Sequence, residues 1–209
     1  MRPLRLVLVR HAQSTANAAD ILDTRLPGSP LTEQGRQQAA ELARRLAHEP
    51  VTAVYASRAL RARQTAEPIA ARHQLAVRVL DGVHEAFLGV FEGRQAPEDH
   101  QAWRKVYRAW HCGELDLAPP GGESGRQVLE RYLAAVATIR CGHTGGTAAL
   151  ISHGAASRLA VAALASNVNS RFAEACQLPN AATVVLEADG VGWRCLRWDS
   201  IELGQAPPG

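Results

Sequence analysis

The chain has few of the residues that mark disulfide-rich, metal-binding and membrane proteins. Its 209 residues include four cysteines, which are widely scattered and form no C-x-x-C pair. We therefore expect neither a disulfide framework nor a metal site, and we interpret the cysteines as buried free thiols. No apolar run approaches the roughly 20 residues of a membrane span. Without a separate signal peptide ahead of the first apolar segment, we expect a cytoplasmic protein with no membrane partner.

Lysine and aromatic residues are also scarce. Lys105 is the only lysine, and the chain has three tyrosines and three phenylalanines. A protein without a lysine-rich patch or an aromatic platform for stacking bases is not expected to bind nucleic acid. Arginine supplies the remaining positive charge, and the net charge of +3 suits a small anionic substrate.

The bulk composition is that of a globular protein, with 46% hydrophobic and 21% charged residues. No repeat, low-complexity segment or linker divides the chain, so we expect one domain over residues 1–201 and a flexible tail over 202–209. Residues 95–122 are predicted to form a cap or insert over the site. The aromatic residues at helical spacing within this segment favour packing in the core over contact with a ligand.

Short β-branched runs alternate with helical patterns along the chain. This order predicts a three-layer α/β sandwich, in which helices flank a mainly parallel six-stranded sheet. The last two strands surround Asp189-Gly190, a strong hairpin signal. The expected strands are 4–9, 51–56, 75–80, 147–151, 182–187 and 191–198.

Polar residues come directly after three of these predicted strands. Arg10-His11 ends the first strand, Ser57 ends the second, and Ser152-His153-Gly154 ends the fourth. An isolated Arg-His pair is more often a surface charge beside a loop histidine. Here the pattern recurs, and ligands of α/β proteins usually bind at the carboxyl ends of strands. We therefore expect a functional site at this edge of the sheet.

The sequence resembles the histidine phosphatase superfamily, which includes the cofactor-dependent phosphoglycerate mutases. The resemblance covers most of the chain, because the family's motifs occur in the family's order. One of these motifs, Pro-Leu-Thr-Glu-x-Gly at residues 30–35, has a structural role in the family and is assigned no chemistry here. The matching segments are Arg-His-x-x-Ser-x-x-Asn at 10–17, Pro-Leu-Thr-Glu-x-Gly at 30–35, Ser-x-x-x-Arg-Ala-x-Gln-Thr-Ala at 57–66, Glu85 before Gly89 and Phe-Glu-Gly at 91–93, Gly-Glu-Ser at 122–124, and Ser-His-Gly at 152–154.

This resemblance implies phosphoryl chemistry through a covalent intermediate. His11 would be the nucleophile that forms a phosphohistidine, and Glu85 would protonate the leaving oxygen. His153 would donate a hydrogen bond to a non-bridging oxygen of the phosphate as charge builds there. Arg10 and Arg61 would bind the phosphate, because guanidinium groups stay charged and can fork onto phosphate oxygens. The resemblance implies no metal and no organic cofactor.

Further substrate contacts are expected from the same motifs. Ser14, Asn17 and the backbone N–H of Gly154 are candidate donors to the phosphate. The motif at 57–66 selects Arg61 among three nearby arginines, which leaves Arg58 and Arg63 as predicted solvent-exposed residues.

Departures from the family pattern favour a phosphatase over a mutase. Ala12 replaces the usual glycine after the first histidine, and its methyl group could press on the phosphate pocket. The mutase-type Arg-His-Tyr run after the acid is replaced here by Ala86-Phe87-Leu88, which suggests a less polar mouth. The double-arginine segment that grips a carboxylate in mutases is not recognisable in residues 95–122. A mutase holds two phosphates in alternation, so missing anion clamps argue against it.

Two alternatives remain open at this level: a cofactor-dependent phosphoglycerate mutase, and a non-catalytic module that binds a phosphorylated ligand. The sequence offers no feature that favours a purely structural protein. The expected partner is a phosphorylated small molecule, and a homodimer is possible. We expect the specificity for one phosphate ester to lie in residues 18–30 and 86–122, where the match to the family motifs is poorest.

Overall fold

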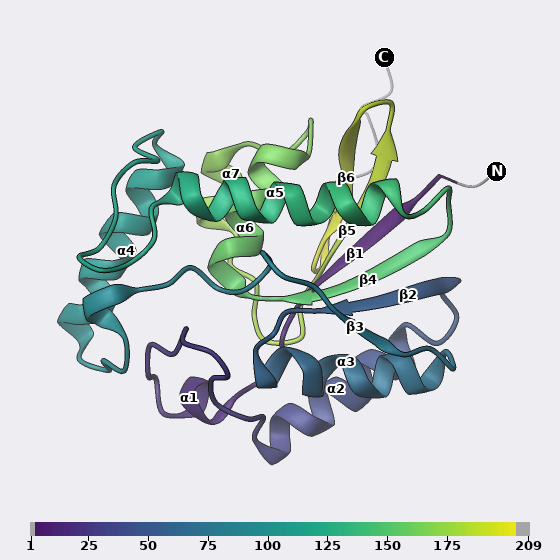
Figure 1. Ribbon diagram of the computed structural model, residues 1–209, viewed down its shortest axis with the longest axis horizontal. Coiled ribbons are helices and arrows are strands. Elements are labelled where there is room, and N and C mark those ends of the chain that lie inside the picture. The colour runs from purple at the N-terminus through teal and green to yellow at the C-terminus, as the bar shows by residue number, and fades with distance from the viewer. Residues whose placement is uncertain (1–2, 204–209) are drawn as a thin grey trace.

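A computed structural model describes residues 3–203 of the protein. A single sheet runs through it in the order β3-β2-β4-β1-β5-β6-β7 (Figure 1). The first four strands in this order are parallel to one another, and the last three pair antiparallel. The strands are β1 Arg5–Arg10, β2 Val51–Ala56, β3 Val77–Val79, β4 Thr147–Ser152, β5 Thr183–Asp189, β6 Gly192–Trp198 and β7 Ile201–Glu202.

The predicted α/β sandwich with a sheet that is mostly parallel in its core is confirmed, but the sheet has seven strands instead of six. The additional strand β7 pairs with the end of β6, so Glu202 belongs to the sheet and not to a flexible tail. Residues 204–209 of the predicted tail lie outside the described part of the chain. Strand β3 has three residues where six were expected, because it lies at the edge of the sheet and pairs only with β2.

Helices cover both faces of the sheet, with α2 and α3 on one side and α5 and α6 on the other (Figure 1). Alternation along β1 explains the two layers, since successive side chains of a strand point to opposite faces. Leu6 and Leu8 pack with the α5 and α6 side, whereas Val7 and Val9 pack with α2 and α3. The helices are α1 Thr15–Ala18, α2 Glu33–Arg45, α3 Leu60–Arg72, α4 Pro97–His111, α5 Gly125–Cys141, α6 Gly154–Leu164 and α7 Ser170–Ala175, with a short 3₁₀ turn at Gly89–Phe91.

Two of the long helices begin with side-chain caps. At the start of α2, the Thr32 hydroxyl oxygen accepts the N–H of Gly35 at 2.9 Å. At the start of α5, Ser124 and Gln127 form a capping box, in which each side chain bonds to the other's backbone N–H. Helix α5 thereby gains a fixed starting point next to the loop that carries Glu85.

Helix α4 lies beyond the end of the sheet (Figure 1). Tyr107 and Trp110 on this helix are buried in the core, as expected for an aromatic stripe. Trp103 is only partly buried, and it packs edge-on against Trp110 with ring centroids 5.2 Å apart. The segment predicted as a cap therefore combines a core-facing side with a side that remains open.

His111 ends α4 and is buried beside Tyr107, with ring centroids 4.8 Å apart. Burial, and after it the charge of Arg158, lowers the pKa of His111 to about 4. An unfolded histidine has a pKa of about 6.5, so the unfolded chain binds this proton first as the pH falls. The contribution of the neutral His111 to the free energy of unfolding is therefore complete above about pH 6.5 and is lost as the pH falls toward 4.

We therefore expect His111→Phe to lose stability less steeply than the wild type between pH 6.5 and pH 4. The difference in slope should be at most about 1.4 kcal/mol per pH unit, the value for one proton. Denaturant unfolding followed at several pH values measures it, with His48→Phe as the control because His48 is exposed. Equal slopes for His111→Phe and the wild type would contradict the assignment.

Two sequence expectations about the surface are resolved by the fold. All four cysteines are free, but only Cys195 is buried; Cys112 and Cys141 are exposed and Cys176 is intermediate. The expectation of buried thiols is thus wrong for three of them, because their positions lie at helix ends. Across residues 3–203, none of the helices combines the length and the apolar character needed to cross a membrane.

Candidate active site

The sheet order brings the polar ends of three strands together. β4 lies between β1 and β2, with Arg10 aligned to Ser152 and Ala56 aligned to Ile151. Because these strands are parallel, the residues that follow them leave the sheet at one edge. The rings of His11 and His153 consequently lie edge to face, with centroids 5.1 Å apart.

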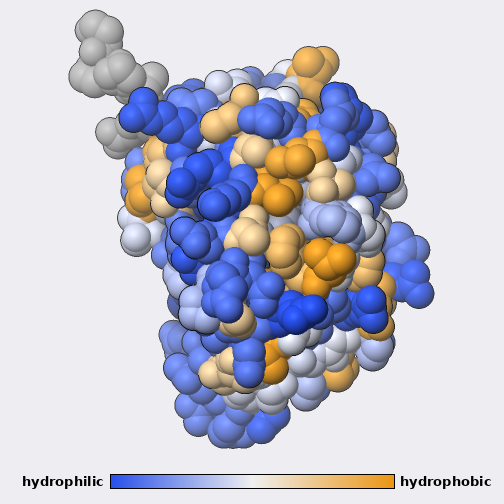
Figure 2. Space-filling model, turned by 90° about the vertical axis from the view of Figure 1, so that its left-hand side faces the viewer, coloured by the Kyte–Doolittle hydropathy of each residue, from blue (hydrophilic) through white to orange (hydrophobic). Residues whose placement is uncertain are grey.

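A cavity of about 600 Å³ opens at this edge, between the strand ends and α4. Figure 2 views the molecule from the α4 end and shows hydrophobic residues in the middle of the face, bordered by hydrophilic ones. His153 lies behind His11, fully buried. The other predicted site residues line the cavity: Arg10, His11, Ser14, Asn17, Arg61, Glu85 and Gly154.

His11 is held as a neutral imidazole. Its Nδ1 lies 2.8 Å from the carbonyl oxygen of Ala12, which can only accept, so Nδ1 carries the proton and donates it. The Nε2 lone pair then accepts the Nε–H of Arg61 at 3.0 Å. Burial, followed by the charges of Arg61 and Arg10, lowers the pKa of His11 well below 6.5. Nε2 therefore carries no proton at neutral pH, and Arg61 holds its lone pair at the cavity.

The second histidine has the opposite tautomer. Nδ1 of His153 faces Nη2 of Arg61 at 3.3 Å, and a guanidinium can only donate. The proton is therefore on Nε2, which donates to the hydroxyl oxygen of Ser57 at 2.8 Å. Burial and the charge of Arg61 lower the pKa of His153 well below 6.5. Both ring nitrogens are engaged inside the protein, and a direct contact of His153 with phosphate remains a prediction.

The two arginines reach the cavity from different sides of the sheet edge. Arg10 donates through Nη1 to the carbonyl of Leu178 at 2.6 Å, while its Nε is buried without a hydrogen-bond partner. Arg61 is 2% exposed and contacts Asp23, through Nη2 to the carbonyl at 3.0 Å and Nη1 to Oδ2 at 3.4 Å. Burial lowers the pKa of both arginines, which nevertheless remain cations at any working pH.

Glu85 lies at the N-terminus of α6. Its carboxylate oxygens accept the backbone N–H groups of Ala155 at 3.0 Å and Ala156 at 2.8 Å, and Oε1 also accepts that of Ala86 at 2.9 Å. Gly154 begins the same helix, and a Cβ there would lie 3.3 Å from Nε of Arg10. Glycine thus lets the guanidinium lie against the helix start, where backbone N–H groups favour an anion.

Ser14 and Asn17 cap the short helix α1 while they line the cavity. The Ser14 hydroxyl accepts the N–H of Asn17 at 3.2 Å, which occupies one of its acceptor positions. Oδ1 of Asn17 accepts from the backbone of Ser14 at 3.1 Å and from Nδ2 of Asn180 at 3.1 Å. Since its oxygen is turned toward these donors, the Asn17 amide nitrogen is left for the cavity.

The Pro-Leu-Thr-Glu motif supports the loop that follows β1. Gly35 lies so close to this loop that a Cβ would come within 2.0 Å of the Gln13 carbonyl oxygen. The Gln13 N–H donates to Gln38 at 2.9 Å, and the Ala12 N–H donates to Thr65 at 3.0 Å. The structural role expected for this motif therefore acts directly on the loop that carries His11.

Three expectations about the cavity wall need correction. The methyl group of Ala12 packs with Leu31 and other apolar residues in a small buried cluster, so it does not press on the cavity. Ala86 is buried and does not line the cavity, whereas Leu88 is largely buried but does contribute apolar surface to the cavity wall. Helix α4 contributes two arginines to the cavity wall, Arg104 and Arg108, although no arginine pair was recognisable there in the sequence. The two arginines are four residues apart, so they become neighbours only in a helix and do not stand out as a pair in the sequence.

Sequence reasoning missed several residues that hold the site. Ser57 lies inside a recognised motif, so its position could have indicated a role. Asp23, which contacts Arg61, and Asn180, whose amide donates to the His11 carbonyl at 3.0 Å, carry no such signal. In residues 3–203, no three His, Cys, Asp or Glu side chains are grouped as metal ligands.

Comparisons with known proteins show which sequences and structures this chain resembles. The family model described as histidine phosphatase superfamily (branch 1) matches residues 6–201. A protein of Mycobacterium tuberculosis described as uncharacterised is 38% identical over 146 residues, which cover 70% of this chain and 71% of that protein. The probable phosphoglycerate mutase GpmB of Salmonella choleraesuis is 33% identical over 159 residues, covering 73% of this chain and 71% of that one.

Among solved structures, a mycobacterial glucosyl-3-phosphoglycerate phosphatase has the same fold. It aligns with a TM-score of 0.80 at 26% sequence identity, and the alignment covers 96% of this chain and 100% of that one. The structural neighbours thus include phosphatases, while the curated relatives include a probable mutase.

Proposed function

Because the chain belongs to the histidine phosphatase superfamily, we propose that it hydrolyses a small-molecule phosphate monoester through a phosphohistidine on His11. The observation that carries this proposal is the neutral, buried His11, whose Nε2 lone pair lies at the cavity beside Arg61. A neutral imidazole is a nucleophile, and Arg10 and Arg61 at the cavity wall supply the charge that a phosphate dianion needs.

In the first step, Nε2 of His11 attacks the phosphorus atom. The bond from phosphorus to the ester oxygen breaks as the N–P bond forms, and a proton from Glu85 passes to that oxygen. Oε1 of Glu85 accepts two backbone N–H groups and Oε2 accepts one, so Oε2 has room for the proton. Arg10 and Arg61 bind the phosphate oxygens, while Asn17 and the N–H of Gly154 add neutral donors.

In the second step, water attacks the phosphorus atom of the phosphohistidine. Glu85, now a carboxylate, takes a proton from this water, and the N–P bond breaks with its electron pair returning to Nε2 of His11. The proton stays on Nδ1 throughout and is donated as a hydrogen bond to the Ala12 carbonyl, which keeps the ring in one tautomer. His153 also contacts Arg61 through Nδ1, and its hydrogen bond to a non-bridging oxygen of the phosphate remains a prediction.

The cavity indicates a substrate larger than inorganic phosphate. Its volume of about 600 Å³ falls in the range of about 300–1,000 Å³ typical of sites for organic ligands. Trp103, Tyr107, Arg104 and Arg108 line the part contributed by α4. A leaving group with both polar and flat apolar surface suits this wall, and such a phosphorylated small molecule is the expected partner.

The test is the release of phosphate from p-nitrophenyl phosphate by the purified chain, together with trapping of the intermediate. Alkaline quenching followed by peptide mass spectrometry should find phosphate on His11, and acid treatment should remove it. A chain that binds phosphate but neither releases nitrophenol nor becomes labelled would be a binding module, contrary to the proposal.

A phosphoglycerate mutase is the second candidate, favoured by the probable mutase among the relatives and by the arginines of α4. Incubation with 3-phosphoglycerate and a catalytic amount of the bisphosphate separates the two activities. A phosphatase releases inorganic phosphate, whereas a mutase produces 2-phosphoglycerate without net loss of ester. We expect release of phosphate, and net isomerisation would replace the phosphatase assignment.

A further inference from the structure

The loop at residues 82–87, which carries Glu85, is held against α5 by one half-buried arginine. Arg131 lies in the second turn of α5, and its side chain is 16% exposed. Through Nη1 it donates to the carbonyls of Gly82 at 2.6 Å and His84 at 2.7 Å. Through Nη2 it donates to the carbonyl of Glu85 itself at 3.1 Å.

The remaining donors of Arg131 bind a single carboxylate. Nε donates to Oε1 of Glu123 and Nη2 donates to Oε2, both at 2.8 Å. A guanidinium has five N–H donors, and these five contacts use all of them. Burial alone would raise the pKa of Glu123, but the hydrogen bonds and charge of Arg131 outweigh it, so the pKa is lowered and the carboxylate stays ionised.

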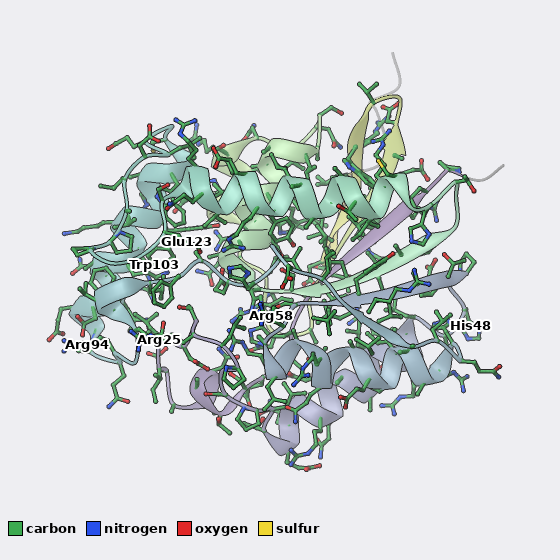
Figure 3. All side chains as sticks on the ribbon, viewed as in Figure 1. Arg25, His48, Arg58, Arg94, Trp103 and Glu123 are labelled. Atoms are coloured by element: carbon green, nitrogen blue, oxygen red, sulfur yellow. The ribbon has the colours of Figure 1, made fainter. Side chains whose placement is uncertain are left out.

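Glu123 fastens the other end of the same loop. Its Oε2 accepts the N–H of Phe87 at 2.9 Å, and its own N–H donates to the Phe87 carbonyl at 2.9 Å. In Figure 3, Glu123 is labelled at the end of α5 that lies toward Trp103 and α4, far from His48 at the opposite end of the molecule. The pair formed by Arg131 and Glu123 therefore spans the loop on both sides of Glu85.

The backbone around Arg131 also restricts the loop. Gly82 has a φ of +86°, and a Cβ at this position would come within 2.6 Å of the Arg131 carbonyl oxygen. On the opposite side of the loop, the hydroxyl of Ser152 donates to the Val83 carbonyl at 2.8 Å. The loop is thus held between α5 and β4, and the Arg131 guanidinium determines where the backbone of Glu85 lies.

We infer that Arg131 is a positioning residue for proton transfer: it holds the backbone of Glu85 so that the carboxyl group, anchored on the start of α6, faces the ester oxygen. This inference rests on the proposed role of Glu85. A displacement of about 1 Å in a reacting group can cost about 100-fold in rate, so losing these contacts should be felt in catalysis. Lysine can replace the arginine only in part, because it has three donors on a single nitrogen and cannot make all five contacts.

The experiment compares two aryl phosphates of similar shape, phenyl phosphate and p-nitrophenyl phosphate. Nitrophenolate leaves readily without protonation, whereas phenolate needs the acid. We measure kcat/KM, which reports the steps up to formation of the phosphohistidine. For Arg131→Met, we expect a fall of about 100-fold with phenyl phosphate and of less than about 5-fold with p-nitrophenyl phosphate. Arg131→Lys should behave in the same way with a smaller loss.

Arg140→Met is the matched control. Arg140 lies on the same helix and also binds backbone carbonyls, those of Gly190 and Gly192, but in the β5–β6 hairpin away from the cavity. It should change kcat/KM for both substrates by less than 2-fold, which marks the range expected for a lost structural contact. An equal fall with both substrates in Arg131→Met, or none, would overturn the inference.

Glu85→Gln separates this inference from the proposed function. If Glu85→Gln shows no dependence on the leaving group, the assignment of the acid fails. If Glu85→Gln shows it and Arg131→Met does not, only the role of Arg131 fails. Should Arg131→Met not fold, Glu123→Gln provides the test, because it keeps the side-chain shape and weakens the fork to Arg131. Its expected result is the same selective loss with phenyl phosphate.

Discussion

Replacing His11 with alanine is expected to abolish turnover while leaving phosphate binding in place. We predict a fall in kcat of roughly 10⁴-fold or more with p-nitrophenyl phosphate, the scale seen when a covalent nucleophile is removed. Arg10 and Arg61 remain in the cavity wall, so inorganic phosphate should still bind. Steady-state hydrolysis measures the first effect, and calorimetric titration with phosphate measures the second.

His48→Ala serves as the control for this variant. His48 is exposed and lies at the far end of the molecule from the cavity (Figure 3), so its loss should not change kcat. Thermal unfolding of both variants checks that each retains the fold. Measurable steady-state hydrolysis by a folded His11→Ala protein would defeat the assignment of the nucleophile.

The second large effect is expected for Arg61→Met. This guanidinium contacts Nε2 of His11, Nδ1 of His153 and the carbonyl of Asp23. Loss of an arginine that stabilises a phosphoryl transition state costs about 10³–10⁵-fold in rate, and we expect kcat/KM to fall by about 10³. Arg63→Ala on the same helix is the control, because Arg63 is exposed.

The pH profile gives Arg61→Met a more specific outcome. Burial and then the charge of Arg61 lower the pKa of His11, so removing this charge lets that pKa rise toward 6.5. Activity requires the neutral imidazole. As the pH falls, the variant should therefore begin to lose activity at a higher pH than the wild type does. If kcat/KM of the variant is reduced but falls at the same acidic pH as in the wild type, Arg61 does not act on the pKa of His11.

A double variant distinguishes catalysis from stability in this experiment. Removing Arg61 leaves the Asp23 carboxylate without its cation in a partly buried position, which is destabilising. Asp23→Asn combined with Arg61→Met should regain stability against denaturant. Activity should stay low, because the double variant still lacks the guanidinium charge that binds the phosphate. Recovery of activity together with stability would mean that Arg61 serves the fold alone.

The sequence was most informative where chemistry and local structure coincide. The β-branched run before Arg10 predicts a buried strand, and the structure has this strand with four buried residues in its middle. The short edge strand β3 and the added strand β7 were less predictable, since an edge strand is defined by what it pairs with. Local pattern carries little information about a partner far away in the chain.

By itself, the sequence determined which side chains could perform phosphoryl transfer and that parallel strands would bring them to one edge of the sheet. Only the tertiary structure decided the tautomers of His11 and His153, which depend on whether a carbonyl or a guanidinium faces each ring nitrogen. It alone placed the arginines of α4 at the cavity and Arg131 on the loop of Glu85. These are contacts between distant segments, so their distances follow from packing, which no local pattern encodes.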